Sequence, residues 1–528
     1  MISFDLLLVS LSLLVALLFC PSFSTAQPPW TLSSKYGLLD IVLIDSVSQV
    51  TVGNQTAPAR CWNNTFFGPT LRVSPGDQVV IALINNIGVP TNLHFHGLRI
   101  SPLAPADDIF VQVQQGTPFI YQFTVPSEHP PGAFWYHSHA HGLSEWEVFN
   151  GMSGVMIIEG LLAPFPVALQ GITHQVFGLR DLQMINGSIP GNQIIDSDAP
   201  TTRFVNGNTQ ANITMMGNET QLWTLANIGA DIFYNLTFVP SLPLYIISVD
   251  GQRTNQVVNV SYHVLGPGMR VEFLVVAPDV ASEFTLVTQE MNTGPAGDDY
   301  PLAQLVQLTV SNSVVAIPVA LPDESSFPAV VDLTTLQITA TRQFAFADAG
   351  AGFTINNEAF DMDRVDVTIP LGAVEEWTIV NVAQELHLFH IHQGDFQVTS
   401  INGVPVPFTG YQDSVILPIN DQNWTTVTII FPFNKPYLLG KFVFHCHILA
   451  HEDNGMMAVV EVINSCPAFA TTNDAWFLTP VGQTAFGARR WPVWPTDSAL
   501  SVRRHLGARA GHPLQQLFNR EPHPHRLV

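Results

Sequence analysis

The sequence predicts an all-β protein made of related domains in tandem. Short runs of β-branched and aromatic residues alternate with Gly, Pro, Asn and Asp turns, for example at 79–84, 270–276 and 426–431. Long stretches of helical periodicity are scarce, and 36 Gly and 39 Pro are spread along the chain. A chain of 528 residues allows roughly three or four domains. These observations favour β-sandwiches or barrels.

An internal repeat predicts three domains. A segment rich in apolar residues that ends in an asparagine occurs three times, with Asn85, Asn227 and Asn381 as its markers. The markers are 142 and 154 residues apart, which is the length of a domain. We therefore predict three β-domains at residues 27–163, 164–318 and 319–466.

The composition excludes two broad classes of protein. Hydrophobic residues make up 47% of the chain, so disorder throughout is excluded. Only 19 residues are basic against 42 acidic ones, and the net charge of −23 argues against nucleic acid as a partner. Residues 487–528 differ, since they hold seven of the basic residues and lack a strand pattern. We predict that residues 467–528 form a largely disordered C-terminal tail.

The N-terminus resembles a secretory signal. Residues 6–19 are almost wholly apolar but too short for a good membrane span, and Ser24, Thr25 and Ala26 offer a cleavage site. We predict a signal peptide at residues 1–26 and no membrane span after its removal. A signal anchor is the alternative, because Asp5 precedes the apolar run and Lys and Arg do not. Secretion agrees with eight glycosylation sequons, at Asn54, Asn63, Asn186, Asn212, Asn218, Asn235, Asn259 and Asn423.

Cysteine counting predicts one disulfide. Of 4 cysteines, Cys20 leaves with the signal, and Cys61, Cys446 and Cys466 remain. An odd number leaves one thiol for chemistry and two that can pair. If Cys446 binds metal, as argued below, an oxidising compartment favours a Cys61–Cys466 bridge.

Histidines cluster far beyond chance. The chain has 18, and His-x-His occurs at 94/96, 137/139, 139/141, 390/392, 445/447 and 523/525. Residues i and i+2 of a strand share a face, so each pair offers two imidazoles side by side. Neutral imidazole suits copper, zinc, iron and nickel. Four pairs that share no histidine, 94/96, 137/139, 390/392 and 445/447, lie in the first and third repeats, which predicts one metal cluster shared between those domains.

The middle repeat lacks such pairs. Where the first repeat has His94 and His96 beyond its marker strand, the second has Asn235 and Thr237. We therefore expect the middle domain to act as a spacer and as a possible wall of a substrate cleft.

A second metal site is predicted around Cys446. Strand alternation turns Cys446 away from its neighbours His445 and His447. His387, His451 and Met456 are placed to join it, because His387 precedes His390 by an odd offset and the other two can loop back. A thiolate, two imidazoles and a weak axial thioether are typical of a blue-copper electron-transfer site.

Four histidine segments resemble the motifs of the multicopper oxidases, closest to laccase-like and bacterial-style members. They are 94–97, 135–139, 387–392 and 445–456, in that order along the chain. The resemblance covers roughly residues 60–465 and implies cupredoxin-like Greek-key domains. Two positions depart from the usual motif: Leu388 stands where a proline is common and Gln393 where a glycine is common.

The resemblance implies about four copper ions per chain. It assigns type 1 copper to His387, Cys446, His451 and Met456, and type 2 copper to His94 and His390. It assigns the type 3 pair to His96, His137, His139, His392, His445 and His447. In similar enzymes, acids at the places of Glu452 and Asp107 assist proton delivery; an acid that only orients a histidine is the alternative.

The function implied is a secreted oxidoreductase with dioxygen as acceptor. Laccase-like members oxidise phenols and aromatic amines, and electrons pass from Cys446 to His445 and His447. A metallo-oxidase of ferrous, manganous or cuprous ions is one alternative, and it would use acids near the type 1 site such as Asp453. Bilirubin or ascorbate oxidation remains open. A non-catalytic copper-storage or structural protein is the alternative outside enzymology.

Overall fold

Alternating apolar residues extend the backbone into strands, and the paired strands bury one face of each sheet. The computed structural model describes residues 30–52, 55–196, 199–348, 352–419 and 424–464. The predicted strand segments at 79–84, 270–276 and 426–431 all lie in strands, so the all-β class is confirmed. The predicted signal and tail, Asn54, Asn423 and Cys466 lie outside the described residues.

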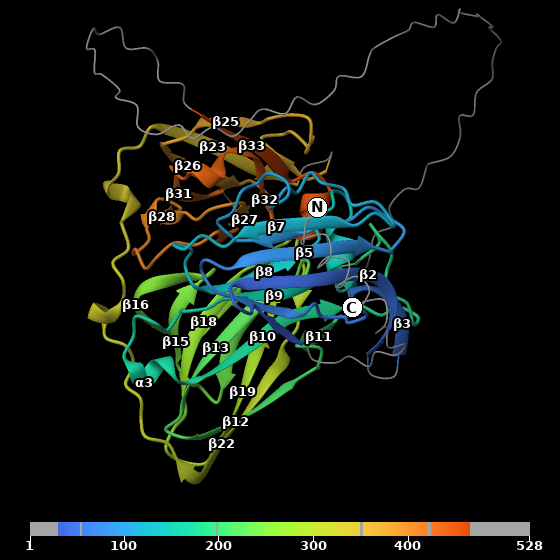
Figure 1. Cartoon of the computed structure of the whole chain (residues 1–528). Helices are drawn as coiled ribbons and strands as arrows, with labels where there is room; N and C mark the ends of the chain where they lie inside the picture. The colour runs from blue at the N-terminus through green and yellow to red at the C-terminus, as the bar shows by residue number, and fades with distance from the viewer. Residues whose placement is uncertain (1–29, 53–54, 197–198, 349–351, 420–423, 465–528) are drawn as a thin grey trace, which may run out of the picture. The chain divides into compact units, whose positions relative to one another are not determined.

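The sheets occur along the chain as three successive pairs, which Figure 1 separates by colour into blue, green and orange groups. The first pair consists of a sheet of order β3-β2-β5-β7 and one of order β1-β4-β9-β8-β6. Its strands are β1 (Thr31–Ser33), β2 (Leu38–Val52), β3 (Gln55–Trp62), β4 (Thr70–Val73), β5 (Gln78–Asn85), β6 (His94–His96), β7 (Phe119–Thr124), β8 (Gly132–His137) and β9 (Ser153–Ile158).

The middle pair consists of sheets β11-β10-β13-β18-β15-β16 and β12-β22-β19-β14-β17, with a small β20-β21 ribbon. Its strands are β10 (Thr173–Leu182), β11 (Thr202–Val205), β12 (Ala211–Gly217), β13 (Thr220–Asn227), β14 (Tyr234–Val239), β15 (Leu244–Val249), β16 (Gln252–Val260), β17 (Tyr262–Leu265), β18 (Arg270–Val276), β19 (Ser282–Gln289), β20 (Met291–Asn292), β21 (Asp299–Tyr300) and β22 (Ala303–Val315).

The third pair consists of sheets β24-β23-β26-β31-β28-β29 and β25-β33-β32-β27-β30. Its strands are β23 (Ala340–Ala347), β24 (Thr354–Ile355), β25 (Val367–Pro370), β26 (Ala373–Asn381), β27 (His387–Ile391), β28 (Gln397–Ile401), β29 (Val404–Pro405), β30 (Ser414–Leu417), β31 (Thr425–Phe433), β32 (Gly440–Cys446) and β33 (Met457–Ile463).

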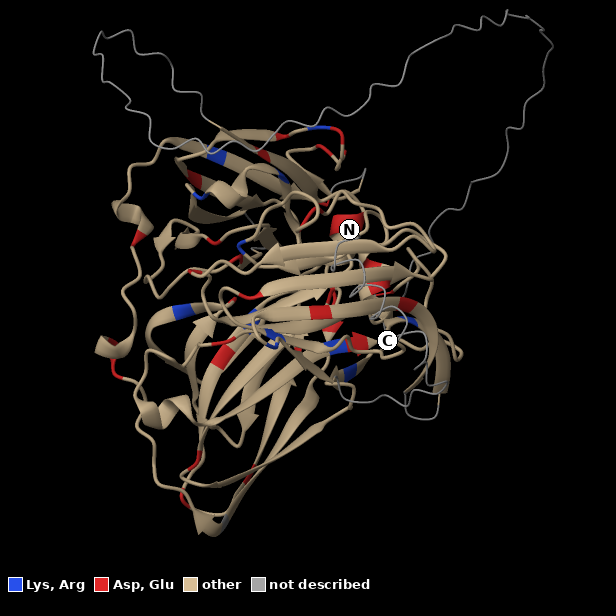
Figure 2. Cartoon of the chain, viewed as in Figure 1, with Lys and Arg blue, Asp and Glu red and all other residues tan. Residues whose placement is uncertain are grey.

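Helices within the described ranges are short. They are α2 (Ser144–Asn150), α3 (Val167–Gln170) and α4 (Leu449–Asp453), with 3₁₀ turns η1 (Glu324–Ser326), η2 (Leu333–Thr335) and η3 (Pro436–Leu438). None of these helices has the length and apolar character that crossing a bilayer requires. In Figure 2 the ribbon positions of Lys, Arg, Asp and Glu are sparse among the described residues, and more of them are coloured red for acidic residues than blue for basic ones.

The three marker asparagines have the same position and the same hydrogen-bond pattern in their pairs of sheets. Each ends a strand that runs parallel to an earlier one: β5 beside β2, β13 beside β10 and β26 beside β23. Each side-chain amide is buried, accepts from the backbone N–H two residues later and donates to carbonyls of two loops. The acceptor carbonyls belong to Val89 and Val113, to Ile232 and Leu265, and to Glu385 and Leu417.

This equivalence gives the sequence repeat a physical cause, because a buried amide that closes the same loops is expensive to replace. We propose that each pair of sheets is one of the three domains whose bounds the sequence suggests.

Candidate metal centre

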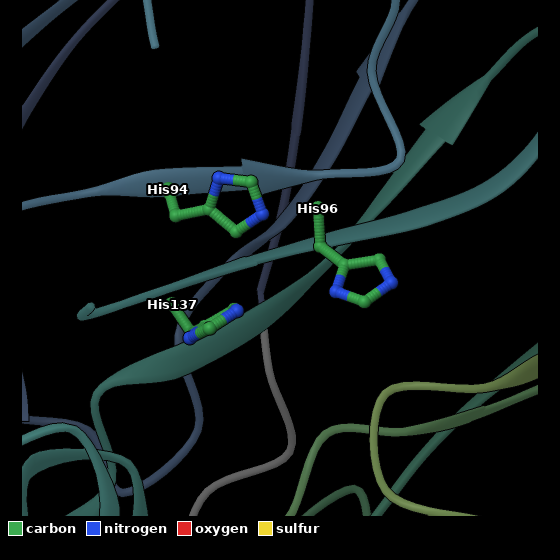
Figure 3. A group of neighbouring side chains, drawn as sticks. All are labelled: His94, His96 and His137. Carbon is green, nitrogen blue, oxygen red and sulfur yellow. The ribbon is translucent and has the colours of Figure 1, made fainter. Parts of the chain in front are cut away.

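Strand register brings the histidine pairs together. In the first pair of sheets, β6 runs antiparallel to β8 and places His94 opposite His137. In the third pair, β27 runs antiparallel to β32 and places His390 opposite His445. Side chains directly opposite each other in an antiparallel ladder are neighbours on one face. Figure 3 shows His94, His96 and His137 gathered from β6 and β8.

All eight histidines of the four predicted pairs meet in one buried cluster. Ring nitrogens within 4.8 Å of one another form the groups His94/His96/His137, His94/His390/His392 and His139/His392/His445. His447 joins them, since its Nε2 lies 3.1 Å from His96 Nδ1. The cluster therefore combines residues of the first and third pairs of sheets, as the sequence predicts.

The free ring atoms of the cluster fit metal ions. The Nδ1 atoms of His137 and His390 each donate to a backbone carbonyl at 2.8 Å, which leaves Nε2 of both rings buried without a partner. Burial lowers the pKa of both imidazoles to about 3, so the rings are neutral at physiological pH. Neutral imidazoles with a fixed tautomer and an unpartnered nitrogen are what a metal site requires.

A second group forms on the other face of β32. Cys446 Sγ lies 3.6 Å from Nδ1 of both His387 and His451, and these two Nδ1 atoms are 3.1 Å apart. Cys446 and His387 are fully buried, and burial raises the pKa of the thiol while it lowers that of His387 to about 3. A thiolate here needs a cation beside it, and a soft metal supplies one.

Met456 is placed to serve this second group. It is fully buried, its carbonyl accepts from Cys446 N at 3.0 Å, and its N–H donates to the His451 carbonyl at 2.9 Å. Met456 and Cys446 belong to one apolar cluster, whereas Met457 packs with Ile109 and Val443 in another. The two adjacent methionines therefore point in different directions.

Asp107 is buried against His94. Its two oxygens lie 3.1 and 3.0 Å from His94 Nδ1, and it also accepts from the Phe95 N–H and from Gln393 Nε2 at 2.7 Å. Burial raises its pKa to about 7, although the hydrogen bonds from Phe95 and Gln393 oppose the rise. The carboxyl thus holds the His94 ring so that Nε2 faces the cluster.

The unusual Gln393 has a visible role. Its φ is +67°, in the left-handed region where a glycine is the ordinary residue. Its side chain links the third pair of sheets to Asp107 in the first. A hydrogen bond to a buried carboxyl offsets the backbone cost.

Glu452 lies between two cluster histidines. Its oxygens are 3.4 Å from His139 Nδ1 and 3.1 Å from His445 Nδ1, and the side chain is fully buried. Burial and the nearby Asp453 raise its pKa well above the usual value, which favours a carboxyl that carries a proton. Asp453 is engaged elsewhere, because its carboxylate accepts from the backbone N–H groups of Gly142, Ser144 and Glu145.

Two further acids contact histidines of the two groups, and sequence reasoning does not identify them. Asp413 lies 3.2 Å from His96 Nε2, and Glu385 lies 3.5 Å from His451 Nε2. Glu385 precedes His387 by two residues, and that proximity is the one signal that marks it. Asp413 has no such signal, because it is far in sequence from every motif and only folding brings it to the cluster.

Other histidines and one further cysteine lie outside the two groups. His129, His141, His174 and His263 belong to none of the groups of potential metal ligands among the described residues. Cys61 is buried and forms no disulfide with another described cysteine, and burial raises the pKa of its thiol to about 12. Because Cys466 lies outside the described residues, the Cys61–Cys466 disulfide stays a prediction.

A buried imidazole cluster beside a group of one cysteine and two histidines, carried on pairs of β-sheets, is typical of copper redox proteins. Two family models, both described as multicopper oxidase, match residues 46–161 and 328–465. The multicopper oxidase of Staphylococcus haemolyticus is 26% identical over 76% of this chain and 83% of its own. The laccase of Bacillus subtilis is 23% identical over 77% of this chain and 90% of its own.

A solved structure, of the Campylobacter jejuni multicopper oxidase described as a metallo-oxidase, superposes with a TM-score of 0.70. It is 21% identical and covers 84% of this chain and 96% of its own. This likeness supports the cupredoxin-like fold. The chain belongs to the multicopper oxidase family. It is an oxidoreductase of the kind that uses dioxygen and a reducing substrate, and the family implies copper as the metal.

Proposed function

We propose that this chain is a secreted laccase-like enzyme that oxidises phenols and aromatic amines and reduces dioxygen to water. The observation that carries the proposal is the link between the two donor groups. Cys446 is joined by single peptide bonds to His445 and His447, and its thiol faces the opposite side from their rings. The chain thus offers a direct covalent path from one group to the other.

We assign the ligands as the family resemblance suggests. Type 1 copper would be held by His387, Cys446, His451 and Met456, and type 2 copper by His94 and His390. The type 3 pair would be held by His96, His137, His139, His392, His445 and His447. Bound there, about four copper ions would supply one-electron oxidation of the substrate and four-electron reduction of dioxygen.

The edge of His451 is the proposed place of substrate contact. Among the four residues of the Cys446 group, His451 is 7% exposed, whereas Cys446, His387 and Met456 are fully buried. The Phe353 ring stacks on His451 with centroids 4.1 Å apart, so the ring edge is the part that a substrate can approach. Glu385 stands at that edge, with a carboxyl oxygen 3.5 Å from His451 Nε2.

Two acids are placed to deliver protons for dioxygen reduction. Glu452 lies between His139 and His445, and Asp107 lies against His94, each deep inside the protein. Raised pKa values let both carboxyls hold a proton near neutral pH. We therefore assign proton delivery to Glu452 and Asp107, with orientation of the adjacent histidines as their second task.

Oxidation of metal ions is the second candidate function. Glu385 lies beside His451, and burial together with the negative charges of Asp348 and Asp298 raises the pKa of Glu385 to about 8, so acidic residues gather on this side of the Cys446 group. Such surroundings attract cations such as ferrous, manganous or cuprous ions. The Campylobacter jejuni protein is described as a metallo-oxidase, which is a precedent for this function in this fold.

Oxygen consumption decides between the two substrates. The copper-loaded protein is offered a panel of phenols and aromatic amines, then ferrous, manganous and cuprous ions, and kcat/KM is compared. We expect phenols to lead, and metal analysis to find about four coppers per chain. If Glu385→Ala lowers metal-ion turnover and leaves phenol turnover intact, and metal ions are the faster substrates, the second function replaces the first.

Secretion is a separate part of the proposal. The sequence features that support it are the apolar N-terminal segment and the sequons. Expression of the full chain in a eukaryotic host should release a shortened, glycosylated protein into the medium. Treatment with an N-glycosidase and mass measurement would then reveal the occupied sequons, and a product retained in cells at full length would contradict secretion.

A further inference from the structure

An arginine from the middle pair of sheets reaches the imidazole cluster. Arg270 is the first residue of β18 and is fully buried. Its guanidinium donates to both carboxylate oxygens of Asp413, at 2.9 and 2.6 Å, and to the carbonyls of Ala133 and Gly268. These partners lie in all three pairs of sheets, so the arginine joins them at one point.

Asp413 connects this arginine to two proposed copper ligands. Its carboxylate lies 3.2 Å from His96 Nε2, and its backbone carbonyl accepts from His390 Nδ1 at 2.8 Å. Because one nitrogen of each ring is engaged, the other is left for metal: Nδ1 of His96 and Nε2 of His390. His96 comes from the first pair of sheets and His390 from the third.

Backbone packing shows that the fit is tight. A Cβ on Gly268, in the turn before β18, would lie 2.8 Å from His447 Nε2. A Cβ on Gly97 would lie 2.5 Å from Asp413 Oδ2 and 2.6 Å from the Arg270 guanidinium. Both glycines also have positive φ values. The middle pair of sheets therefore touches the cluster through backbone as well as through Arg270.

Asp250 holds the backbone on both sides of the Arg270–Asp413 ion pair. Its Oδ1 accepts from the Arg270 N–H at 2.9 Å, and its Oδ2 faces the N–H of Ser414 at 3.3 Å. The segment that carries Asp413 is thus held to the middle pair of sheets by backbone and side chain alike.

We propose that Arg270 and Asp413 are positioning residues of the copper cluster, through which the middle domain sets the orientation and tautomer of His96 and His390. The inference rests on the proposed copper site. It adds a role for the middle domain to the expected ones of spacer and cleft wall, because that domain would influence metal binding without donating a ligand.

A role only in stabilising the fold explains the Arg270–Asp413 ion pair less well. Removing two charges from water costs several kcal/mol per ion, and apolar residues of similar size often stabilise a core as well or better. An ion pair retained at this depth needs a task that apolar residues lack. A carboxylate that accepts from a ligating imidazole has such a task, since it fixes the ring and raises the basicity of the free nitrogen.

Two variants test the proposal, Asp413→Asn and Arg270→Met. For each, apo-protein is titrated with copper, and the blue absorption and the type 2 electron paramagnetic resonance spectrum are recorded. We expect copper affinity at the cluster to fall about 10- to 100-fold and the type 2 spectrum to change. The blue signal should persist, because none of the residues around Cys446 contacts this ion pair.

Arg342→Met is the control for the loss of an ion pair elsewhere in the protein. Arg342 on β23 also forms a two-pronged ion pair, with Glu375 on β26 at 2.6 and 2.9 Å, away from the histidine cluster, although Arg342 is less buried than Arg270. This variant should lower thermal stability and leave the type 2 spectrum unchanged. Equal copper loss in the control would reduce the effect to general destabilisation and overturn the proposal.

Full occupancy with an unaltered type 2 spectrum in either cluster variant would also overturn it. If Arg270→Met does not fold, the isosteric Asp413→Asn decides by the same criteria. Should the wild-type chain itself bind fewer than two coppers, the proposed function fails first, and that outcome is recognised before any variant is made.

Discussion

The outer and middle pairs of sheets have the same scaffold but carry different residues at corresponding places. The strand after each marker asparagine is β6 with His94 and His96, β27 with His390, and β14 with Asn235 and Thr237. In β14 the histidines are missing, yet Asn227 closes its loops as Asn85 and Asn381 do. The same scaffold therefore forms with or without the histidines, which occur only on particular strands.

The comparison also shows that a region without ligands can still act on a metal site. The middle pair of sheets supplies Arg270 to Asp413 and places the turn at Gly268 against His447. Four predictions test this difference between the regions that carry the proposed ligands and the region that does not.

The largest effect is expected for Cys446→Ser. A hydroxyl is a poor ligand where a soft thiolate is needed, so the blue colour and substrate oxidation should both disappear. Copper binding by the eight histidines should survive, because none of them is changed. Visible absorption and copper analysis provide the check, and a blue mutant would refute the assignment of Cys446.

The second-largest effect is expected for Glu452→Gln. Replacing a buried proton donor should lower turnover about 100-fold, since acid–base groups contribute at least this much in many enzymes. Copper content and the blue absorption should stay near wild type. Stopped-flow reoxidation of the reduced protein by dioxygen measures the step directly, with Asp107→Asn as a companion. Unchanged reoxidation with Gln would assign Glu452 to orientation of His139 and His445 alone.

Asn227→Ala and Asn381→Ala form a matched pair across the two regions. Each removes a buried amide and leaves backbone partners unsatisfied, so each should lower the free energy of unfolding by about 2 kcal/mol. Denaturant unfolding of the apo-proteins tests this. Only Asn381→Ala should alter the blue absorption, because its partner Glu385 stands beside His451. A change in the blue absorption of Asn227→Ala would show that the middle pair of sheets also acts on the Cys446 group.

The smallest effect is a shift of potential in Met456→Leu. A thioether donates electron density and favours the cupric state, so its loss should raise the type 1 potential while Cys446, His387 and His451 keep the metal. Met457→Leu is the control, because Met457 packs into a separate apolar cluster. Redox titration of both variants settles the matter, and a shift in the control alone would place the axial ligand at Met457.

Much of the site follows from local sequence rules. Two-residue periodicity puts His94 with His96 and turns Cys446 away from His445, because alternate side chains of a strand face opposite ways. The marker asparagines indicate the repeat, because each closes a loop within its own domain. Such features depend on residues close in sequence, or on patterns that recur in it.

Only the tertiary structure decided which residues from different domains meet. Asp413, Arg270 and His96 are at least 143 residues apart in sequence, and no periodicity links them; β6, β18 and the segment before β30 must fold and pack first. The same holds for Gln393, whose strained backbone makes sense once its amide is seen to reach Asp107. Through local geometry the sequence determined which histidines share a strand face and where the repeated marker asparagines lie. The charges that orient those ligands depend on packing between domains, because a buried ion pair forms wherever the fold brings its two partners together.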